Sequence, residues 1–363
     1  MLMQHIFREN GEIYFSLEYL PEETPHREEQ INILKNYIIR GLRNKAYRPP
    51  IILGPSGTGK TTVIKKVLYE IRMEYENIEA ENFNMMVVSS TYSAIRTICS
   101  YITPIPERGL SIGEIIERLY STLEMRNLYF FVGLDDSDEL LRRDKGKILE
   151  ILTRLNEQFG EYRVYPIVVV RDIKPIYVLP DHIRSKLGGI MLRFNPYNYK
   201  QLIDISRERI RKGFRDDVIS ENAVKNAALI TEIKFGGNAR EMITLLYNAG
   251  VRAEAIRQYK ITSDLIRQVF FEGYYTHIIG ITDKKDLIEL LNVIIKELDE
   301  DEYELDNDVL RRIYSEYRKV YNIPWDKFLK KLEYLTYLGY LTYRENKYLN
   351  LYLPKSLLSK KYL

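Results

Sequence analysis

Residues 54–62, with the sequence GPSGTGKTT, constrain the fold of this chain more than any other segment. Residues 50–53 have the character of a short buried strand and precede them, and the stretch VIKKVLYEIRMEY, typical of a helix, follows. A strand, a glycine-rich turn and a helix in this order are the context of a phosphate-binding loop. The glycines permit a tight turn in which successive N–H groups face the phosphates at the positive end of the helix. The segment therefore predicts a bound nucleoside triphosphate, with a chance glycine-rich turn as the alternative.

Two side chains of this loop have defined roles in the prediction. Lys60 is expected to reach the β- and γ-phosphates, and the hydroxyl of Thr61 is expected to ligate Mg²⁺. The expected cofactors are therefore Mg²⁺ with ATP or ADP. The predicted nucleotide-binding residues of the loop are Gly54, Pro55, Ser56, Gly57, Thr58, Gly59, Lys60, Thr61 and Thr62.

An apolar run at residues 128–134 has the pattern of a second strand and ends in Asp135 and Asp136. Asp135 is the expected carboxylate of the metal shell. Asp136 stands where a hydrolytic base, commonly Glu, polarises water, but its side chain is one methylene shorter, and a base works only within about 3 Å of its proton. Slow or absent hydrolysis is therefore expected, and whether the chain is an enzyme stays open. The alternative is that Asp136 and Asp138 are solvated loop carboxylates.

Further strands are expected at residues 85–89 and 166–170, with helical stretches between them. Strands that alternate with helices predict a parallel sheet with helices on both faces, and nucleotides bind at the carboxyl ends of such strands. From about residue 198 to residue 281 the pattern instead indicates four helices and no strand, which fits a helical bundle packed over the nucleotide.

Composition narrows the class of protein. A chain of 363 residues suits two or three domains. No window has the roughly 18 apolar residues that span a bilayer, and the first residues are too polar for a signal peptide, so we expect a cytoplasmic protein with no membrane partner. The single cysteine, Cys99, cannot form an internal disulfide, and this fits a reducing compartment.

The carboxyl-terminal part has a segregated charge. Residues 299–308 hold seven acids and no base, whereas residues 309–363 hold twelve bases against four acids, although the net charge of the chain is only +3. Helices are expected near 285–298, near 307–321 and after Pro324, followed by a short hairpin. Three helices and a hairpin predict a winged helix, whose third helix enters the major groove of DNA.

The functional interpretation of this basic end is contact with the phosphates of double-stranded DNA, and the alternative is a solvated basic face. Three of the candidate lysines lie on the expected third helix, and one arginine and one lysine lie on the hairpin turn. The predicted DNA contacts of this region are Lys327, Lys330, Lys331, Arg344 and Lys347.

Five short motifs accompany the phosphate-binding loop along the chain. They are PHRE at 25–28, GLS at 109–111, NPYN at 195–198, GNAR at 237–240 and LTYLGYLT at 335–342. Taken in this order, they resemble those of the archaeal replication initiators of the Orc/Cdc type, a branch of the AAA+ ATPases. The resemblance spans roughly residues 14–353. It implies an α/β fold class, with an AAA+ P-loop parallel-sheet domain, a helical lid and a C-terminal winged-helix domain.

The resemblance also implies roles for residues outside the loop. By it, Pro25, His26 and Arg27 contact the adenine base. Tyr197 lies at the entry to the lid and contributes to the nucleotide site, and Arg240 is the sensor 2 arginine of the lid.

A second DNA contact is implied in the first domain. There Arg96 and Arg108 flank an initiator-specific insertion near residues 91–112. The chain departs from the family's pattern at Asp136, which stands in place of Glu, and at Arg171, which stands where sensor 1 is usually Asn. Asp135 and these two residues are the expected catalytic positions, and nucleotide binding should tolerate the two departures better than turnover does.

The expected domains are residues 1–195 for the nucleotide-binding domain, 196–282 for the lid and 283–363 for the winged helix. The expected function is an ATP-dependent, nucleoid-associated initiator that recognises double-stranded origin DNA and assists recruitment of a replicative helicase, with paralogous initiators as further partners. One alternative is a nucleotide-loaded transcriptional or plasmid regulator without turnover. Another is a motor-type AAA+ helicase or clamp loader, which needs a working base and an intersubunit arginine finger.

Overall fold

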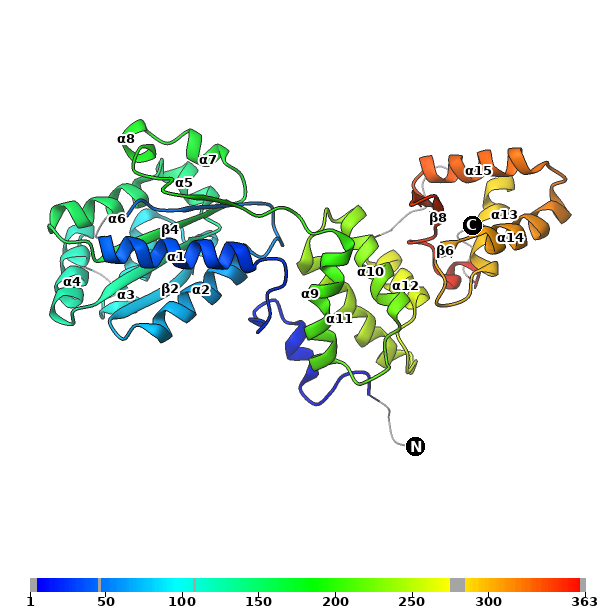
Figure 1. The fold of residues 1–363 in the computed structure, drawn as a ribbon, viewed down its shortest axis with the longest axis horizontal. Helices are drawn as coiled ribbons and strands as arrows, with labels where there is room; N and C mark the ends of the chain where they lie inside the picture. Colours follow the sequence, from blue (N-terminus) through cyan, green and yellow to red (C-terminus); the bar gives the residue numbers. More distant parts are fainter. Residues whose placement is uncertain (1–4, 45–46, 107–108, 275–284, 360–363) are drawn as a thin grey trace. The chain divides into compact units, whose positions relative to one another are not determined.

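The computed structural model describes residues 5–44, 47–106, 109–274 and 285–359. The chain divides into two compact units, one formed by Leu20–Pro196 and the other by Met1–Tyr19 together with Tyr197–Leu363 (Figure 1). In the described parts of both units, no helix is both long and apolar enough to cross a lipid bilayer.

A five-stranded parallel sheet forms the centre of the Leu20–Pro196 unit. Its strands lie in the order β2 (Ile78–Asn84), β3 (Tyr129–Asp135), β4 (Val164–Val170), β1 (Ile51–Leu53) and β5 (Met191–Arg193), and every neighbouring pair is parallel. The predicted α/β class with a parallel sheet is therefore confirmed. β1, β3 and β4 lie where the apolar runs predicted them.

The strand predicted at residues 85–89 is wrong. The strand ends at Asn84, and Met85–Val87 form a short 3-10 helix, η2, which the Asn84 side chain caps by accepting a hydrogen bond from the backbone N–H of Met86 at 2.8 Å. The real strand, β2, lies at the edge of the sheet and has polar residues at four of its seven positions. An edge strand with a half-exposed face gives a weaker apolar signal than the buried strands beside it.

Helices cover both faces of this sheet. One face packs on α1 (Glu28–Asn44) and α2 (Lys60–Glu74), and the other packs on a set of helices that follow β2, β3 and β4. That set comprises α3 (Thr91–Ile102), α4 (Ile112–Met125), α5 (Asp138–Asp144), α6 (Lys147–Gln158), α7 (Lys174–Tyr177) and α8 (Asp181–Arg184). Successive residues of β4 enter the two cores alternately, Ile167 on one side and Val168 on the other. Burial on both faces explains why β3 and β4 are continuously apolar.

Four helices form the lid-like part of the second unit, as predicted. They are α9 (Tyr199–Gly213), α10 (Glu221–Lys234), α11 (Ala239–Ala255) and α12 (Ser263–Tyr274). A short helix near the amino terminus, η1 (Gly11–Phe15), packs against α9 and α11, where the Phe15 ring lies 4.5 Å from that of Phe214 between centroids. The sequence did not indicate this docking of the first residues.

The predicted winged helix is confirmed at the carboxyl-terminal end. Its helices are α13 (Lys285–Glu297), α14 (Asn307–Val320) and α15 (Trp325–Tyr337), and its hairpin is β7 (Thr342–Arg344) with β8 (Lys347–Leu349).

Glu345 and Asn346 form the hairpin turn with φ of 50° and 63°, as a two-residue primed turn requires. A further short strand, β6 (Glu304–Leu305), lies in the acidic segment and pairs with β8, which was not predicted. The predicted domain limits stay predictions, and the limit at 282/283 lies outside the described residues.

Candidate nucleotide site and DNA-binding surface

The predicted catalytic and phosphate-binding segments meet at one edge of the sheet. β3, β4 and β1 are consecutive neighbours, and because they are parallel their carboxyl ends share that edge. The phosphate-binding loop follows β1, Arg171 follows β4, and Asp135 ends β3. This is the edge at which open α/β sheets bind ligands.

The phosphate-binding loop has the backbone geometry that the glycines predict. Gly57 and Gly59 have φ of 72° and 87°, and α2 begins at Lys60. The buried Lys60 ammonium donates to the carbonyl oxygens of Gly54 at 2.6 Å and Pro55 at 2.7 Å. Thr58 Oγ1 donates to the same Pro55 carbonyl at 2.9 Å. The lysine side chain is thus held across the loop at the start of the helix.

Gly54 is required by close packing rather than by its dihedral angles. A Cβ at this position would clash with the carbonyl oxygen and the Cβ of Phe194, which follows β5. The backbone of Phe194 is fixed there because its N–H donates to the Leu53 carbonyl at 2.8 Å. Any side chain at position 54 would separate the loop from β5.

Arg27 braces the phosphate-binding loop from outside it. Its guanidinium is buried and donates to the carbonyls of Thr58 (3.0 Å), His26 (3.1 Å) and Asn195 (2.7 Å). It also lies over the ring of Phe194, 5.2 Å from the centroid. These contacts give Arg27 a positioning role, and its contact with adenine stays a prediction beside that of its neighbours.

Those neighbours are the half-buried Pro25 and the exposed His26, which has φ of 66°. The segment ahead of them is held to α2, because Lys66 Nζ donates to Thr24 Oγ1 at 3.4 Å. The contact of Pro25 and His26 with a base stays a prediction.

Arg27→Ala is expected to destabilise the Leu20–Pro196 unit by about 2–3 kcal/mol, because carbonyls that now accept charge-assisted hydrogen bonds lose their donor in a buried setting. Thermal unfolding should show a melting temperature lower by roughly 5 °C. Arg72→Ala is the matched control, since Arg72 is half-exposed and forms a long ion pair with Glu79 at 3.4 Å. Equal melting temperatures for the two variants would contradict the bracing role.

The end of β3 supplies the buried carboxylate that a metal site needs. Asp135 is 4% exposed and accepts from Asn82 Nδ2 and from the backbone N–H of Asp136, both at 3.0 Å. Asn82 was not predicted as a site residue, because it lies within the polar pattern of an edge strand. Its Oδ1 is buried and has no hydrogen-bond partner among the described residues.

The oxygen ligands at this edge fit a Mg²⁺ ion that is held largely by phosphate and water. Mg²⁺ prefers oxygen ligands and usually takes only one or two carboxylates from the protein beside phosphate oxygens. The Thr61 hydroxyl and the Asp135 carboxylate are ligands of that kind. The described residues contain no group of three or more His, Cys, Asp or Glu that could hold a metal without a nucleotide.

The two residues that depart from the family's pattern contact each other. Arg171 Nε donates to Asp136 Oδ1 at 3.0 Å, and this hydrogen bond raises the pKa of Arg171. The interpretation of Asp138 as a solvated carboxylate is wrong. Asp138 is 8% exposed, and both its oxygens accept from the backbone N–H of Arg171 at 3.0 Å.

The two predicted lid residues, Tyr197 and Arg240, both belong to the helical unit. The Tyr197 N–H donates to the Gly237 carbonyl at 3.3 Å, and Gly237, with φ of 71°, leaves no room for a Cβ beside the Tyr197 carbonyl. Asn238 caps α11 by accepting from the Arg240 N–H at 3.0 Å. Arg240 is exposed and follows this contact by three residues, whereas Tyr197 is buried, and the contribution of both residues to the nucleotide site stays a prediction.

The predicted DNA contacts of the winged helix fall into two groups. Three of them are ion-paired within the chain, namely Lys331 with Asp286, Arg344 with Glu232 and Lys347 with Glu304. The hydrogen bond from Lys331 lowers the pKa of Asp286, and the hydrogen bond to Glu232 raises the pKa of Arg344. Lys327 and Lys330 are exposed on α15 and have no acidic partner among the described residues.

The predicted DNA contact of the first domain is only partly described. Arg96 is half-buried on α3, and its Nε is buried without a hydrogen-bond partner in the described part of the chain. Arg108 lies outside the described residues. α3 packs against α4, which Ser111 and Glu114 cap reciprocally. The contact of this helix pair with DNA stays a prediction.

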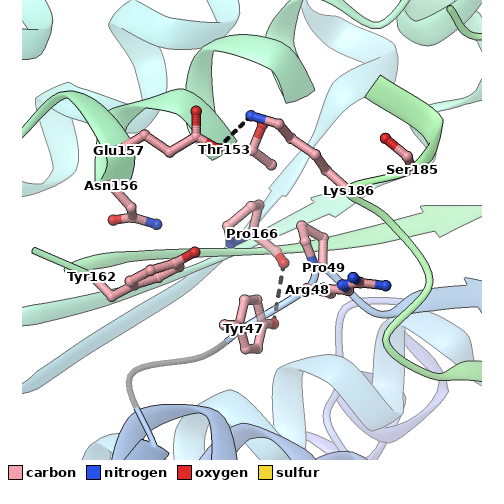
Figure 2. Close-up of a pocket in the computed structure, with 10 residues that line it drawn as sticks. All are labelled: Tyr47, Arg48, Pro49, Thr153, Asn156, Glu157, Tyr162, Pro166, Ser185 and Lys186. Atoms are coloured by element: carbon pink, nitrogen blue, oxygen red, sulfur yellow. Dashed lines mark hydrogen bonds and ion pairs between the residues drawn. The ribbon is translucent and has the colours of Figure 1, made fainter. Parts of the chain in front are cut away.

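A separate small pocket lies near the amino ends of β1 and β4 (Figure 2). Its volume is about 150 Å³. Two of its lining residues are joined by a hydrogen bond, in which Lys186 Nζ donates to Glu157 Oε1 at 2.6 Å. None of the predicted site residues lines it. The lining residues are Tyr47, Arg48, Pro49, Thr153, Asn156, Glu157, Tyr162, Pro166, Ser185 and Lys186.

Two family models match the chain. The model described as the Cdc6 AAA+ ATPase-type lid domain matches residues 203–270, and that of the ATPase family associated with various cellular activities (AAA) matches residues 50–161. These regions cover most of the four-helix part of the second unit and the phosphate-binding loop with β3, respectively.

Curated relatives of similar sequence come from archaea. The ORC1-type DNA replication protein of Desulfurococcus amylolyticus is 26% identical over 260 residues, which are 70% of this chain and 66% of that protein. The ORC1-type DNA replication protein 1 of Sulfurisphaera tokodaii is 31% identical over 258 residues, 70% of this chain and 64% of that protein. The chain thus spans just under two thirds of the length of these relatives.

Solved structures show the same fold. The crystal structure of Cdc6p from Pyrobaculum aerophilum has a TM-score of 0.83 at 24% identity, covering 97% of this chain and 96% of that one. The Aeropyrum pernix ORC1 protein in complex with DNA has a TM-score of 0.66 at 23% identity, covering 98% and 95%. Both family models, these relatives and these folds agree, and the chain is similar to the archaeal Orc/Cdc type of AAA+ proteins.

Proposed function

We propose that this chain binds ATP with Mg²⁺ and, in that state, binds double-stranded origin DNA as a replication initiator that assists recruitment of a replicative helicase. The observation that carries the proposal is one chain with both a braced phosphate-binding loop beside a buried carboxylate and a winged helix with exposed lysines. The names of the curated relatives support the replication role, and the DNA complex of Aeropyrum pernix ORC1 supports DNA as the partner.

In this proposal the carboxyl-terminal edge of the parallel sheet binds the nucleotide, and the winged helix binds DNA. Lys60 and the loop N–H groups hold the phosphates, while Thr61 and Asp135 hold the metal. Lys327 and Lys330, which are neighbours on α15, contact phosphates beside the major groove that this helix enters. The proposed location is the nucleoid, and the proposed protein partners are a helicase and paralogous initiators.

Two measurements test the proposal. Protein purified without added nucleotide is denatured, and the released nucleotide is identified by chromatography, with ATP or ADP expected at close to one per chain. Chromatin from the host is then mapped for bound sites, which should cluster at replication start points rather than at promoters. The absence of nucleotide binding at millimolar ATP, or a distribution confined to promoters, would refute the initiator role.

A second candidate function is a nucleotide-loaded regulator that binds DNA at promoters without turnover. The ion pair between Asp136 and Arg171 favours it, because the carboxylate at the position of the hydrolytic base is bound to a guanidinium. The same mapping separates the two functions, since a regulator would be found at promoters and its deletion would change transcription but not the timing of replication.

A further inference from the structure

The two unusual residues at the nucleotide edge are held by their backbones as well as by their side chains. The Asp136 N–H donates to Asp135 Oδ1 at 3.0 Å, and Asp136 has φ of 49°, a conformation that few residues with a side chain adopt. After β4, the N–H groups of Arg171 and Asp172 donate to Asp138 of α5, at 3.0 and 3.2 Å. Both ends of the Asp136–Arg171 pair are therefore anchored.

The end of β4 and the start of α5 are further tied together. Both the N–H and the hydroxyl of Ser137 donate to the Val169 carbonyl, at 3.1 and 2.8 Å, and Ser137 is buried. The far end of the Arg171 guanidinium contacts Met86 Sδ at 3.2 Å. The side chain of Arg171 thus lies between Asp136 and η2, and the fold fixes the separation of the two charged groups.

Such a pair occupies an acceptor atom that a general base needs. In hydrolysis, a water oxygen forms a bond to the γ-phosphorus, the bond from that phosphorus to the β–γ bridging oxygen breaks, and the water proton passes to a base, leaving ADP and inorganic phosphate. The guanidinium of Arg171 occupies one acceptor oxygen of the Asp136 carboxylate, so that oxygen is not open to the water proton. The guanidinium also has no acceptor atom with which to orient the water.

We propose that Asp136 and Arg171 act as a coupled positioning pair that suppresses ATP hydrolysis and so prolongs the ATP-bound form of the chain. The inference rests on the proposed nucleotide binding and adds a regulatory property to that site. The two residues are coupled in their effect on hydrolysis: placing the family's residue at only one of the two positions leaves the other unusual residue in place, so hydrolysis stays slow. Asp136→Glu keeps a carboxylate beside Arg171, and Arg171→Asn frees a carboxylate that is too short to reach the water.

The test is a double-mutant cycle on the full chain. ATP turnover is measured for the wild type, Asp136→Glu, Arg171→Asn and the double variant, with radioactive ATP in a single-turnover format. Each single substitution is expected to change the rate less than about threefold, and the double substitution is expected to raise it about 100-fold or more, the lower end of the range that a positioned base contributes. The gain should lie in kcat, with the KM for ATP unchanged.

Controls separate this inference from the proposed function. ATP affinity is measured independently by calorimetry: a wild type that does not bind ATP would refute the proposed function and the coupling with it, whereas normal binding with independent effects of the two substitutions would overturn the coupling alone. Arg154→Gln is the matched control, because Arg154 forms an ion pair of the same length with Glu150 at 3.0 Å on α6. Its turnover should equal that of the wild type.

Two outcomes would overturn the coupling. One is a single substitution that reaches the rate of the double variant, and the other is a double variant whose rate equals the product of the single effects. Asp136→Glu with Arg171→Gln provides a second double variant with a neutral side chain of greater length, in case the first fails to fold. The same gain is expected from it, and circular dichroism verifies the fold of each protein.

Discussion

Lys60→Ala is expected to weaken ATP binding about 100-fold or more, the largest effect of any single substitution in the nucleotide site. Charge-assisted hydrogen bonds to phosphate are each worth about 1.5–3 kcal/mol, and a lysine in this position makes more than one of them. The Lys60 ammonium already lies over the loop, on the carbonyls of Gly54 and Pro55, so it exchanges one set of acceptors for another without a large rearrangement. Calorimetric titration with Mg²⁺–ATP measures the loss.

Lys65→Ala is the matched control for this experiment. Lys65 lies on the same helix, α2, and is exposed. Its removal changes the charge of the chain equally but takes no group from the loop, so ATP affinity should stay within about twofold of the wild type. Comparable losses in the two variants would mean that net charge, rather than the loop, attracts the nucleotide, and the assignment of the site would fail.

The buried parts of the fold could be predicted from the sequence because their signals are local and strong. β3 and β4 are covered on both faces, so they are continuously apolar, and the loop after β1 has its own glycine pattern. β2 was misplaced because it is a polar edge strand. β6 was missed because two residues in an acidic segment form a strand only where β8 provides hydrogen-bond partners.

The site residues could be predicted by position but not by contact. The motifs located the loop, the strand-end aspartates and the arginine after β4. The ion pairs that change their interpretation join residues 35 and 112 positions apart, Arg171 with Asp136 and Arg344 with Glu232. Local sequence patterns contain no information on which distant carboxylate will lie beside a given arginine. Asp138 shows the same limit, since only the fold directs it to the backbone N–H groups after β4.

These contacts also change which basic residues of the winged helix are available for DNA. An ion pair within the chain must be broken, or its carboxylate must be brought near the phosphates, before its cation can neutralise DNA. Arg344 is additionally placed over the Tyr199 ring, 4.8 Å from the centroid, which holds it toward the helices of the lid region. We therefore expect the exposed lysines of α15, rather than the hairpin, to dominate phosphate contact.

Lys327→Ala combined with Lys330→Ala is expected to reduce the affinity for double-stranded DNA by about 10- to 100-fold at moderate salt and to lower the slope of log K against log salt by about two. Each lysine that neutralises a phosphate releases about one counterion, so the change in slope measures how many phosphates the variant leaves without a lysine. Fluorescence anisotropy with a labelled duplex, repeated over a range of salt concentrations, gives both quantities.

Lys331→Ala is the control on the same helix, because Lys331 is adjacent to Lys330 but is paired with Asp286 on α13. A lysine that is paired within the chain neutralises no phosphate and so displaces no counterion from DNA. The slope of log K against log salt should therefore change by less than about half a unit in Lys331→Ala, although affinity can fall slightly because the Asp286 carboxylate loses its partner. A slope change in Lys331→Ala as large as half that of the double variant would show that the internal pair opens on DNA. In that case the ion pairs seen within the chain would not persist in the DNA complex. The hairpin residues Arg344 and Lys347 would then be expected to contact phosphates as much as Lys327 and Lys330 do.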